Sequence, residues 1–251
     1  MPFKFYSKND TPLHVISTYL SLVRRSIASI NDLSRKDSLV IVFDTDTPNG
    51  NTELSAAYKA NRRKFAADED SPYAHLPYVK KALSFLRIGY LDIPHIEADD
   101  VIASVSRDFC ARHVMNKAYI FSTDSDFYQL LDPQTFIVRL KNGQAFEVID
   151  RCYVQKKLGV APEQYIEYKC LVGDTADNIK GVRGVGPATA RKIVCGKIKF
   201  DTDAHRDVLE LNKKLITLNC GCKKAWRLTD LSYRDDIMNS TNRDIFEDCG
   251  F

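Results

Sequence analysis

Residues 117–126 read Lys-Ala-Tyr-Ile-Phe-Ser-Thr-Asp-Ser-Asp, an apolar run that passes directly into two acids, Asp124 and Asp126. A short run of this kind is typical of a buried strand. Residues 37–43 repeat the pattern, because they are apolar from the third residue onward and Asp44 follows them. Residues that follow parallel strands gather at one edge of an open α/β sheet, where such sheets bind ligands. We therefore expect Asp44, Asp124 and Asp126 at the carboxyl edge of a sheet.

Further elements extend in both directions from these strands. Helical spacing of apolar residues covers Pro12–Ile30, Tyr73–Leu86 and Ala98–His113, and further strands are predicted at Tyr90–Pro94, Thr135–Leu140 and Ala145–Ile149. Asn142-Gly143 favours a hairpin between the last two strands, and Asp150 favours the cap of a helix that ends at Gly159. Strands that alternate with helices predict an α/β fold with a mainly parallel sheet flanked by helices. From Pro162 onward the pattern is helical only. We expect an α/β core over residues 1–160 and a helical domain over residues 161–251.

The composition sets few limits on function. The 251 residues are 44% hydrophobic, enough for one sizeable core, and the net charge of +3 does not by itself indicate a partner. Seven cysteines, an odd number without paired CxxC spacing, favour a reduced intracellular protein; Cys220-Gly-Cys222 is only a weak metal signal. We find no apolar run of about 20 residues and no leader pattern, so we expect a cytoplasmic protein without a membrane partner.

The acids fall into four clusters, of which Asp44 and the pair Asp124 and Asp126 are two. The others are Glu97-Ala98-Asp99-Asp100, which opens a helix, and Gly173-Asp174-Thr175-Ala176-Asp177. Helix capping would explain one or two acids of the third cluster, and polar or Asx turns would explain the aspartate pairs. A common location explains all four together, because carboxylates are the ligands that Mg²⁺ and Mn²⁺ prefer. The joint pattern therefore favours metal-assisted chemistry.

A basic, glycine-rich stretch follows the last acid cluster. Residues 178–200 contain six lysines and arginines and no acid. Glycines allow a backbone to approach a phosphate, and a helix predicted to begin near Pro187 would present its N-terminus to that anion. The alternative is an ordinary connection between two helices. The charge pattern favours binding to a nucleic-acid backbone.

A phosphatase is the competing interpretation of the first cluster. Val42-Phe43-Asp44-Thr45-Asp46-Thr47 is similar to the strand and DxDxT motif of haloacid-dehalogenase-type phosphatases, in which the first Asp is the nucleophile. That family also needs an acidic motif at the end of a later strand. Here Asp174 and Asp177 follow a helical pattern and are three residues apart, which counts against the phosphatase.

Four motifs, in order, carry a closer resemblance. They are Tyr58-Lys59-Ala60-Asn61-Arg62, Glu97-Ala98-Asp99-Asp100, Ser122-Thr123-Asp124-Ser125-Asp126, and the run from Gly173 to Ala190. Together they resemble the 5′-nuclease (flap endonuclease) family, in the bacterial and phage branch that includes the 5′-3′ exonuclease domain of DNA polymerase I and its stand-alone relatives. The resemblance covers about residues 10–230. It implies a PIN-like sheet and a C-terminal helix-three-turn-helix (helix-hairpin-helix) subdomain.

The resemblance implies hydrolysis of DNA with 5′ ends or 5′ flaps by two divalent ions, Mg²⁺ or Mn²⁺. Asp44, Glu97 and Asp99 would hold the first ion, and Asp100 would lie between the ions or act through water. The second ion would be held by Asp124, Asp126, Asp174 and Asp177. The products would carry 5′-phosphate and 3′-hydroxyl ends.

The first motif would lie in a helical arch near residues 58–76 through which the 5′ strand passes. Lys59 and Arg62 would neutralise the scissile phosphate. Tyr58 would stack on a base, with a place in the core as the alternative. Arg63 and Lys64 are better explained as a solvated helix face.

The last motif corresponds to the family's DNA-binding hairpin, at residues 181–189. The expected DNA contacts are Arg183, Gly184, Val185, Gly186, Pro187, Ala188, Thr189, Arg191 and Lys192. The resemblance also implies a potassium ion on the backbone carbonyls of Leu171, Val172, Lys180, Val182 and Val185.

One feature departs from the family. Members begin with an apolar strand that ends in a metal-binding Asp, whereas Met1-Pro2-Phe3-Lys4-Phe5 stands here, so the first family strand is expected to be missing. We expect that the true start lies upstream of Met1; if the product instead lacks this strand and its Asp, the alternative function is a catalytically impaired protein that binds branched DNA. In either case we expect a monomer.

Overall fold

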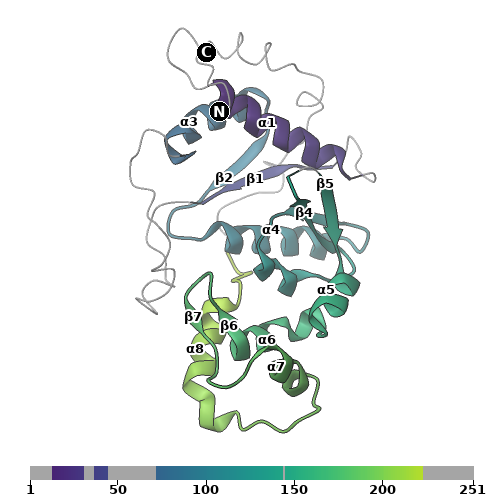
Figure 1. The fold of residues 1–251 in the computed structure, drawn as a ribbon. Coiled ribbons are helices and arrows are strands. Elements are labelled where there is room, and N and C mark those ends of the chain that lie inside the picture. Colours follow the sequence, from purple (N-terminus) through teal and green to yellow (C-terminus); the bar gives the residue numbers. More distant parts are fainter. Residues whose placement is uncertain (1–12, 31–36, 45–71, 144, 223–251) are drawn as a thin grey trace. The chain divides into compact units, whose positions relative to one another are not determined.

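The computed structural model describes residues 13–30, 37–44, 72–143 and 145–222 (Figure 1). The chain divides into two compact units. Among the described residues, the first unit holds 13–43 and 72–92, and the second holds Asp44 and 93–222. No helix in the described ranges is both long and apolar enough to cross a bilayer.

The first unit is a small α/β layer. Helix α1 (Leu13–Ala28) and helix α3 (Leu76–Phe85) pack in one core with strand β1 (Val40–Phe43), and the short 3-10 helix η1 (Pro72–His75) precedes α3. Strand β2 (Gly89–Asp92) pairs with β1 in parallel. These elements confirm the four predicted in this part of the sequence, within a few residues at each end. The parallel pairing follows from the crossover through α3.

The second unit begins with helix α4 (Ala98–Arg112) and a three-stranded sheet. Strand β3 (Ala118–Phe121) pairs in parallel with β4 (Thr135–Lys141), and β4 pairs antiparallel with β5 (Ala145–Ile149). Between β3 and β4 lies the 3-10 helix η2 (Ser125–Leu130). The described strands β1 to β5 thus pair mostly in parallel, as predicted, but they form two separate sheets where the sequence predicted one.

The turn, the helix cap and the helix end that the sequence predicts near the second sheet are all present in the structure. Asn142 and Gly143 both have positive φ, 52° and 71°, at the turn after β4. Asp150 caps helix α5 (Arg151–Leu158) by accepting a hydrogen bond from the Tyr153 N–H at 2.7 Å. Gly159 ends α5 in the left-handed conformation, at φ 73°. These residues act through their own backbone geometry, so they are readable without tertiary information.

The remainder of the second unit is mainly helical. It contains η3 (Pro162–Gln164), α6 (Tyr165–Val172), α7 (Pro187–Val194), η4 (Asp203–His205) and α8 (Arg206–Ile216), which lie together in Figure 1. The expectation that this part is helical only is wrong in one respect: the short strands β6 (Gly173–Asp174) and β7 (Ile179–Lys180) pair antiparallel. Two-residue strands are too short to produce an alternating pattern, so the sequence carries no signal for them.

Candidate active site

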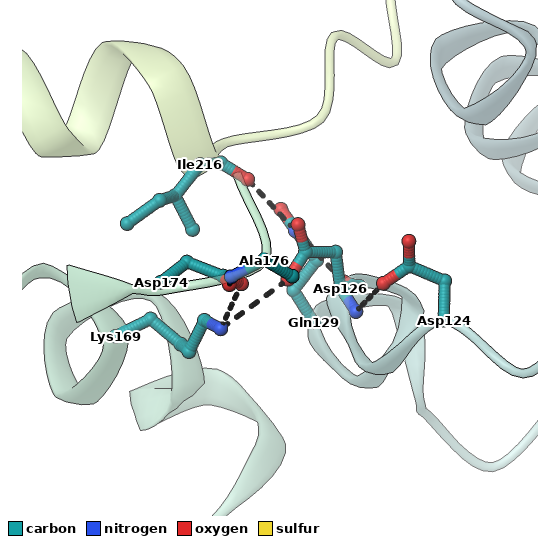
Figure 2. Close-up of polar contacts among 7 residues, drawn as sticks. All are labelled: Asp124, Asp126, Gln129, Lys169, Asp174, Ala176 and Ile216. Atoms are coloured by element: carbon teal, nitrogen blue, oxygen red, sulfur yellow. Dashed lines mark hydrogen bonds and ion pairs between the residues drawn. The ribbon is translucent and has the colours of Figure 1, made fainter. Parts of the chain in front are cut away.

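Four of the predicted metal-binding acids line one cavity in the second unit. Its volume is about 360 Å³, and its wall consists of Thr123, Asp124, Ser125, Asp126, Lys169, Asp174, Ala176 and Asp177. Figure 2 shows how three elements meet there: η2 with its cap supplies two acids, α6 supplies the lysine, and β6 supplies a third acid. The cavity therefore unites the two acid clusters at 124–126 and 174–177.

The first acid pair is held by turn geometry. The carboxylate of Asp124 accepts a hydrogen bond from the Asp126 N–H at 2.8 Å, and the Asp124 N–H donates to the Ser122 hydroxyl at 3.0 Å. This is the Asx turn that the sequence offered as the alternative to a metal role. Because the same side chain also lines the cavity, the turn fixes where the carboxylate lies.

Lys169 is the cavity residue that sequence reasoning missed. Its ammonium group forms an ion pair and a hydrogen bond with the Asp174 carboxylate, and its Nζ lies 3.8 Å from Oδ1 of Asp126. The lysine side chain is only 12% exposed, so these charges meet largely away from water. A single lysine within a helical pattern gives no signal of its own; only the packing of α6 beside η2 makes it part of the site.

The cavity changes the proton affinity of its acids. The pKa of Asp126 is raised to about 7: burial is the largest cause, the charge of Lys169 opposes it, and the neighbouring carboxylates Asp124, Asp174 and Asp177 act in the same direction as burial. Burial also tends to raise the pKa of Asp174, but the hydrogen bond and charge of Lys169, together with the backbone N–H donors of Ala176 and Asp177, outweigh burial and lower this pKa. The difference has a geometric cause, because the lysine bonds to Asp174 and lies farther from Asp126.

The other predicted acids gather where α4 begins. Oδ1 of Asp44 lies 3.4 Å from the Ala98 N–H, which donates to it. Glu97 is the N-cap residue of α4 but makes no capping hydrogen bond with its side chain, so capping does not account for it. Asp99 and Asp100 lie in the first turn, and Asp100 Oδ1 accepts a hydrogen bond from the Asn219 N–H at 2.8 Å. Thus Asp44 and the α4 cluster meet, as the sequence predicted from their positions.

The acids of the cavity suit a hard divalent cation by donor type. Oδ1 of Asp126 is buried without a hydrogen-bond partner, and four carboxylates share the wall. Among the described residues, no three acid, histidine or cysteine side chains already stand close enough to hold a metal ion. In the cavity, the ammonium group of Lys169 pairs with Asp174 and lies 3.8 Å from Oδ1 of Asp126, so it offsets part of the negative charge of these carboxylates. By donor type, the cavity acids therefore fit a divalent metal ion.

The glycine-rich hairpin lies in the same unit and reaches solvent. Arg183, Gly184, Gly186, Pro187, Ala188, Arg191 and Lys192 are exposed, whereas Val185 and Thr189 are half-buried. Gly184 has φ 82°, a left-handed conformation that favours glycine, and Pro187 is the first residue of α7. The first turn of α7 is therefore available to an anion.

Two tight contacts tie this hairpin to the helices behind it. A side chain on Gly181 would place its Cβ 2.3 Å from the Val172 carbonyl oxygen, so only glycine allows the approach. The stem of Arg191 lies over Gly159, at 2.5 Å from the position that a Cβ would take. Arg191 thus also packs on the end of α5, a role that the sequence did not indicate.

The carbonyls predicted to hold potassium lie at the end of α6, in β7 and in the hairpin that follows β7. The Leu171 oxygen accepts from the Val182 N–H at 2.8 Å, and the Val182 oxygen accepts from the Val185 N–H at 3.0 Å. The Lys180 oxygen accepts from the side-chain amide of Asn212 at 2.8 Å. A carbonyl oxygen has two lone pairs, so these bonds leave each oxygen a second acceptor position.

Several predicted site residues are not described by the structure. Tyr58, Lys59 and Arg62 lie outside the described residues, as does the predicted arch up to residue 71. The last predicted arch residues, 72–76, form η1 and the first residue of α3.

Comparison with known proteins gives a consistent result. The model of the 5′-3′ exonuclease N-terminal resolvase-like domain matches residues 2–159, and that of the 5′-3′ exonuclease C-terminal SAM fold matches residues 160–201. The chain is 33% identical over 231 residues to DNA polymerase I of Treponema pallidum, covering 91% of this chain and 22% of the polymerase. It is also 33% identical over 236 residues to a 5′-3′ exonuclease of Aquifex aeolicus, covering 89% of this chain and 79% of that protein. The chain thus spans about a fifth of the polymerase but most of the exonuclease.

Solved structures share the fold. A bacteriophage T5 flap endonuclease, crystallised as a pseudo-enzyme–product complex with DNA and metal ions, matches with a TM-score of 0.63 at 21% identity, over 94% of this chain and 91% of that chain. A T5 protein co-crystallised with metal ions gives a TM-score of 0.64 at 20% identity, over 93% and 91%. The first family model alone matches well over half of the residues, and it is not a phosphatase model. The chain belongs to the 5′-3′ exonuclease family.

Proposed function

We propose that this chain is a structure-specific 5′ nuclease that hydrolyses phosphodiesters of DNA with 5′ ends or 5′ flaps. The observation that carries the proposal is the cavity in which four carboxylates meet a buried lysine, in the same compact unit as an exposed basic hairpin. The proposal is supported by membership of the 5′-3′ exonuclease family and by the T5 relatives that were solved with metal ions and DNA.

The acids would hold two divalent ions, Mg²⁺ or Mn²⁺. Asp44, Glu97 and Asp99 would serve the first, with Asp100 beside them, and the cavity acids Asp124, Asp126, Asp174 and Asp177 would serve the second. When bound, such ions lower the pKa of an attacking water and offset the charge of the reacting phosphate. The chain itself supplies the geometry, because an Asx turn fixes Asp124 and the β6–β7 pair fixes Asp174.

The hairpin would hold duplex DNA by its phosphates. Gly184 and Gly186 leave the backbone open, and α7 presents its first N–H groups nearby. Arg183 and Lys192 add charge that does not depend on sequence, so the protein should read geometry and not base order. A potassium ion on the carbonyls around Val182 would stiffen this hairpin.

The remaining roles rest on the motif Tyr58–Arg62. Lys59 and Arg62 would neutralise the scissile phosphate, and Tyr58 would stack on a neighbouring base. The protein would act as a monomer.

The test uses the purified full chain with a labelled 5′-flapped duplex and a 5′-recessed duplex. We expect cleavage with Mg²⁺ or Mn²⁺ that leaves 5′-phosphate and 3′-hydroxyl ends and stops in excess EDTA. Asp124→Asn is the matched variant, because an amide oxygen can still accept from the Asp126 N–H while the charge is lost. It should cut turnover at least 100-fold and leave flap binding in Ca²⁺ within about threefold.

The second candidate, a catalytically impaired protein that binds branched DNA, gives a different result. It would bind the flap as tightly as an active nuclease and show no metal-dependent cleavage. Cleavage that persisted in EDTA would contradict both candidates.

A further inference from the structure

The segment that follows α8 crosses back to the elements that carry the acids. We call residues 217–222 the strap. Leu218 and Cys220 of the strap pack against the core beside η2 and β4. The polar groups of the strap make hydrogen bonds to residues about 90 to 120 positions earlier in the chain. These bonds go to η2 on one side and to α4 on the other.

Gln129 of η2 makes the first connection. Its side-chain nitrogen donates to the backbone oxygen of Asp126 at 2.8 Å and to that of Ile216 at 3.0 Å, and its side-chain oxygen accepts from the Leu218 N–H at 3.0 Å. Figure 2 shows the amide between Asp126 and Ile216. Both N–H groups and the oxygen of one amide are therefore used at once.

Asp100 and Ser104 of α4 make the second connection. Asp100 accepts from the Asn219 N–H at 2.8 Å, and the Ser104 hydroxyl donates to the Asn219 oxygen at 3.0 Å. The same hydroxyl lies 3.2 Å from the Cys222 N–H, which donates to it. Ser104 is 2% exposed, so its hydroxyl has little access to water as an alternative partner. The strap is thus bonded to α4 at Asp100, which directly follows Asp99, and at Ser104 further along the helix.

We infer that Gln129, acting through the strap, is a positioning residue for the metal-binding acids. It holds the backbone of Asp126 against a segment that is itself fixed to α4, which sets the cavity acids relative to the α4 acids. Mg²⁺ tolerates little deviation from octahedral geometry, and groups that orient ligands commonly change metal affinity by about 10- to 100-fold. The inference rests on the proposed metal-dependent nuclease function.

A matched pair of variants separates positioning from ordinary stability. Gln129→Met keeps the length of the side chain and removes its three hydrogen bonds. Gln134→Met is the control, because the Gln134 amide likewise donates to backbone oxygens, those of Cys110, His113 and Asn116, at the opposite end of α4. Both variants remove comparable bonds, and thermal unfolding in EDTA should show similar decreases in stability.

Calorimetric titration of the full chain with Mn²⁺, without DNA, is the decisive measurement. We expect Gln129→Met to weaken Mn²⁺ binding by about tenfold or more and Gln134→Met to stay within about twofold of wild type. On a flapped duplex, Gln129→Met should lower kcat at saturating DNA, with DNA affinity in Ca²⁺ unchanged.

A second pair covers the case in which Gln129→Met does not fold. Ser104→Ala removes an anchor of the strap, whereas Ser106→Ala removes a buried hydroxyl that donates only within α4, to Ile102 and Ala103. Ser104→Ala should weaken Mn²⁺ binding, whereas Ser106→Ala should leave the Mn²⁺ affinity unchanged. Equal Mn²⁺ affinity within each pair would overturn the inference while leaving the proposed function intact. Wild-type protein that bound no Mn²⁺ would overturn the proposed function and the inference together.

Discussion

Lys169 interacts with the same carboxylates that are proposed to bind a metal ion in the acid cavity. Its ammonium group is the positive charge that the cavity wall supplies, and it is bonded to Asp174 and close to Asp126. A buried cation of this kind keeps the carboxylates from repelling each other while no metal is bound. If a metal ion binds these carboxylates, the ion pairs of Lys169 with Asp174 and Asp126 should weaken.

The first prediction follows from this role. Lys169→Met should destabilise the metal-free protein by about 3 kcal/mol, because the carboxylates lose their buried counter-charge. Thermal unfolding in EDTA measures the decrease, and saturating Mn²⁺ should recover more stability in the variant than in wild type. Lys180→Met, a change on the exposed side of β7, is the control. Equal stability of Lys169→Met and wild type in EDTA would show that the pair contributes little.

The raised pKa of Asp126 gives a prediction with a definite sign. Its pKa is about 7 in the folded protein against a usual 3.8, so the folded state favours the protonated form. The stability that Asp126 contributes is present below pH 4 and is lost as the pH rises towards 7. Asp174 has a lowered pKa and acts in the opposite direction, but below about pH 4, outside this window.

Asp126→Asn should therefore stabilise the metal-free protein more at pH 8 than at pH 5, by up to about 3 kcal/mol, because only the part of the shift between pH 5 and pH 7 falls in this interval. Urea unfolding at the two pH values, in EDTA, measures the difference. Asp132→Asn removes a carboxylate outside the cavity wall and serves as control. A stability difference that did not change with pH would mean that Asp126 is ionised without cost in the folded protein.

At the scale of elements, the close pairing of β6 and β7, which leads into the hairpin, requires two glycines that face each other. Gly173 has φ 82°, and a Cβ there would lie 2.4 Å from the Gly181 nitrogen. A Cβ on Gly181 would lie 2.3 Å from the carbonyl oxygen of Val172, the last residue of α6. The pair β6–β7 therefore closes only because neither residue has a side chain.

We predict that Gly181→Ala lowers the free energy of unfolding by about 3 kcal/mol or more, because the added Cβ would meet backbone that cannot move aside. Gly186→Ala should change stability by less than about 1 kcal/mol, since nothing lies within 4 Å of its added Cβ and its φ is −88°. Chemical denaturation of both variants is the measurement. Similar stabilities would indicate that the α6 end and the hairpin separate readily.

The DNA-binding role of the hairpin has its own test. Arg183→Ala and Lys192→Ala should each weaken binding to any duplex and reduce the log–log salt slope by about one unit for each phosphate that the variant no longer binds. Gly184→Val should weaken binding even at low salt, because its defect is steric strain at φ 82° and is not screened. Binding isotherms over a salt series, with circular dichroism as a folding control, distinguish the two effects. Folded variants with the parent's affinity and slope would make the hairpin structural.

At the scale of the whole molecule, metal binding should be coupled to folding. An ion that binds only the folded chain stabilises it by about 2.7 kcal/mol at a concentration of 100 times its Kd. We therefore predict that the unfolding temperature rises steadily with Mn²⁺ concentration, and that Asp124→Asn reduces this rise. Calorimetric scans over a Mn²⁺ series measure it, with Na⁺ at equal ionic strength as control. A flat response in wild type would contradict a metal site in the native state.

The sequence by itself determined the features that depend on a few neighbouring residues. The strand before Asp124, the Asn142-Gly143 turn, the Asp150 cap and the glycine at the end of α5 all follow from local periodicity or backbone geometry. The ordered motifs indicated the family, because they occur within short, recognisable runs. Their position after strands and at the start of α4 was also sufficient to predict that Asp44 meets the α4 acids.

Only the tertiary structure decided which other groups reach those acids. Lys169 enters the cavity from α6, and Asn219 bonds to Asp100 across 119 positions of sequence. The Gln129 amide joins Asp126 to Ile216 in the same way. A lone lysine, glutamine or asparagine has no periodic or motif signal, and backbone acceptors have no side-chain signature at all. These interactions arise from how the helices pack, so their physical cause lies in the folded core and not in any local pattern.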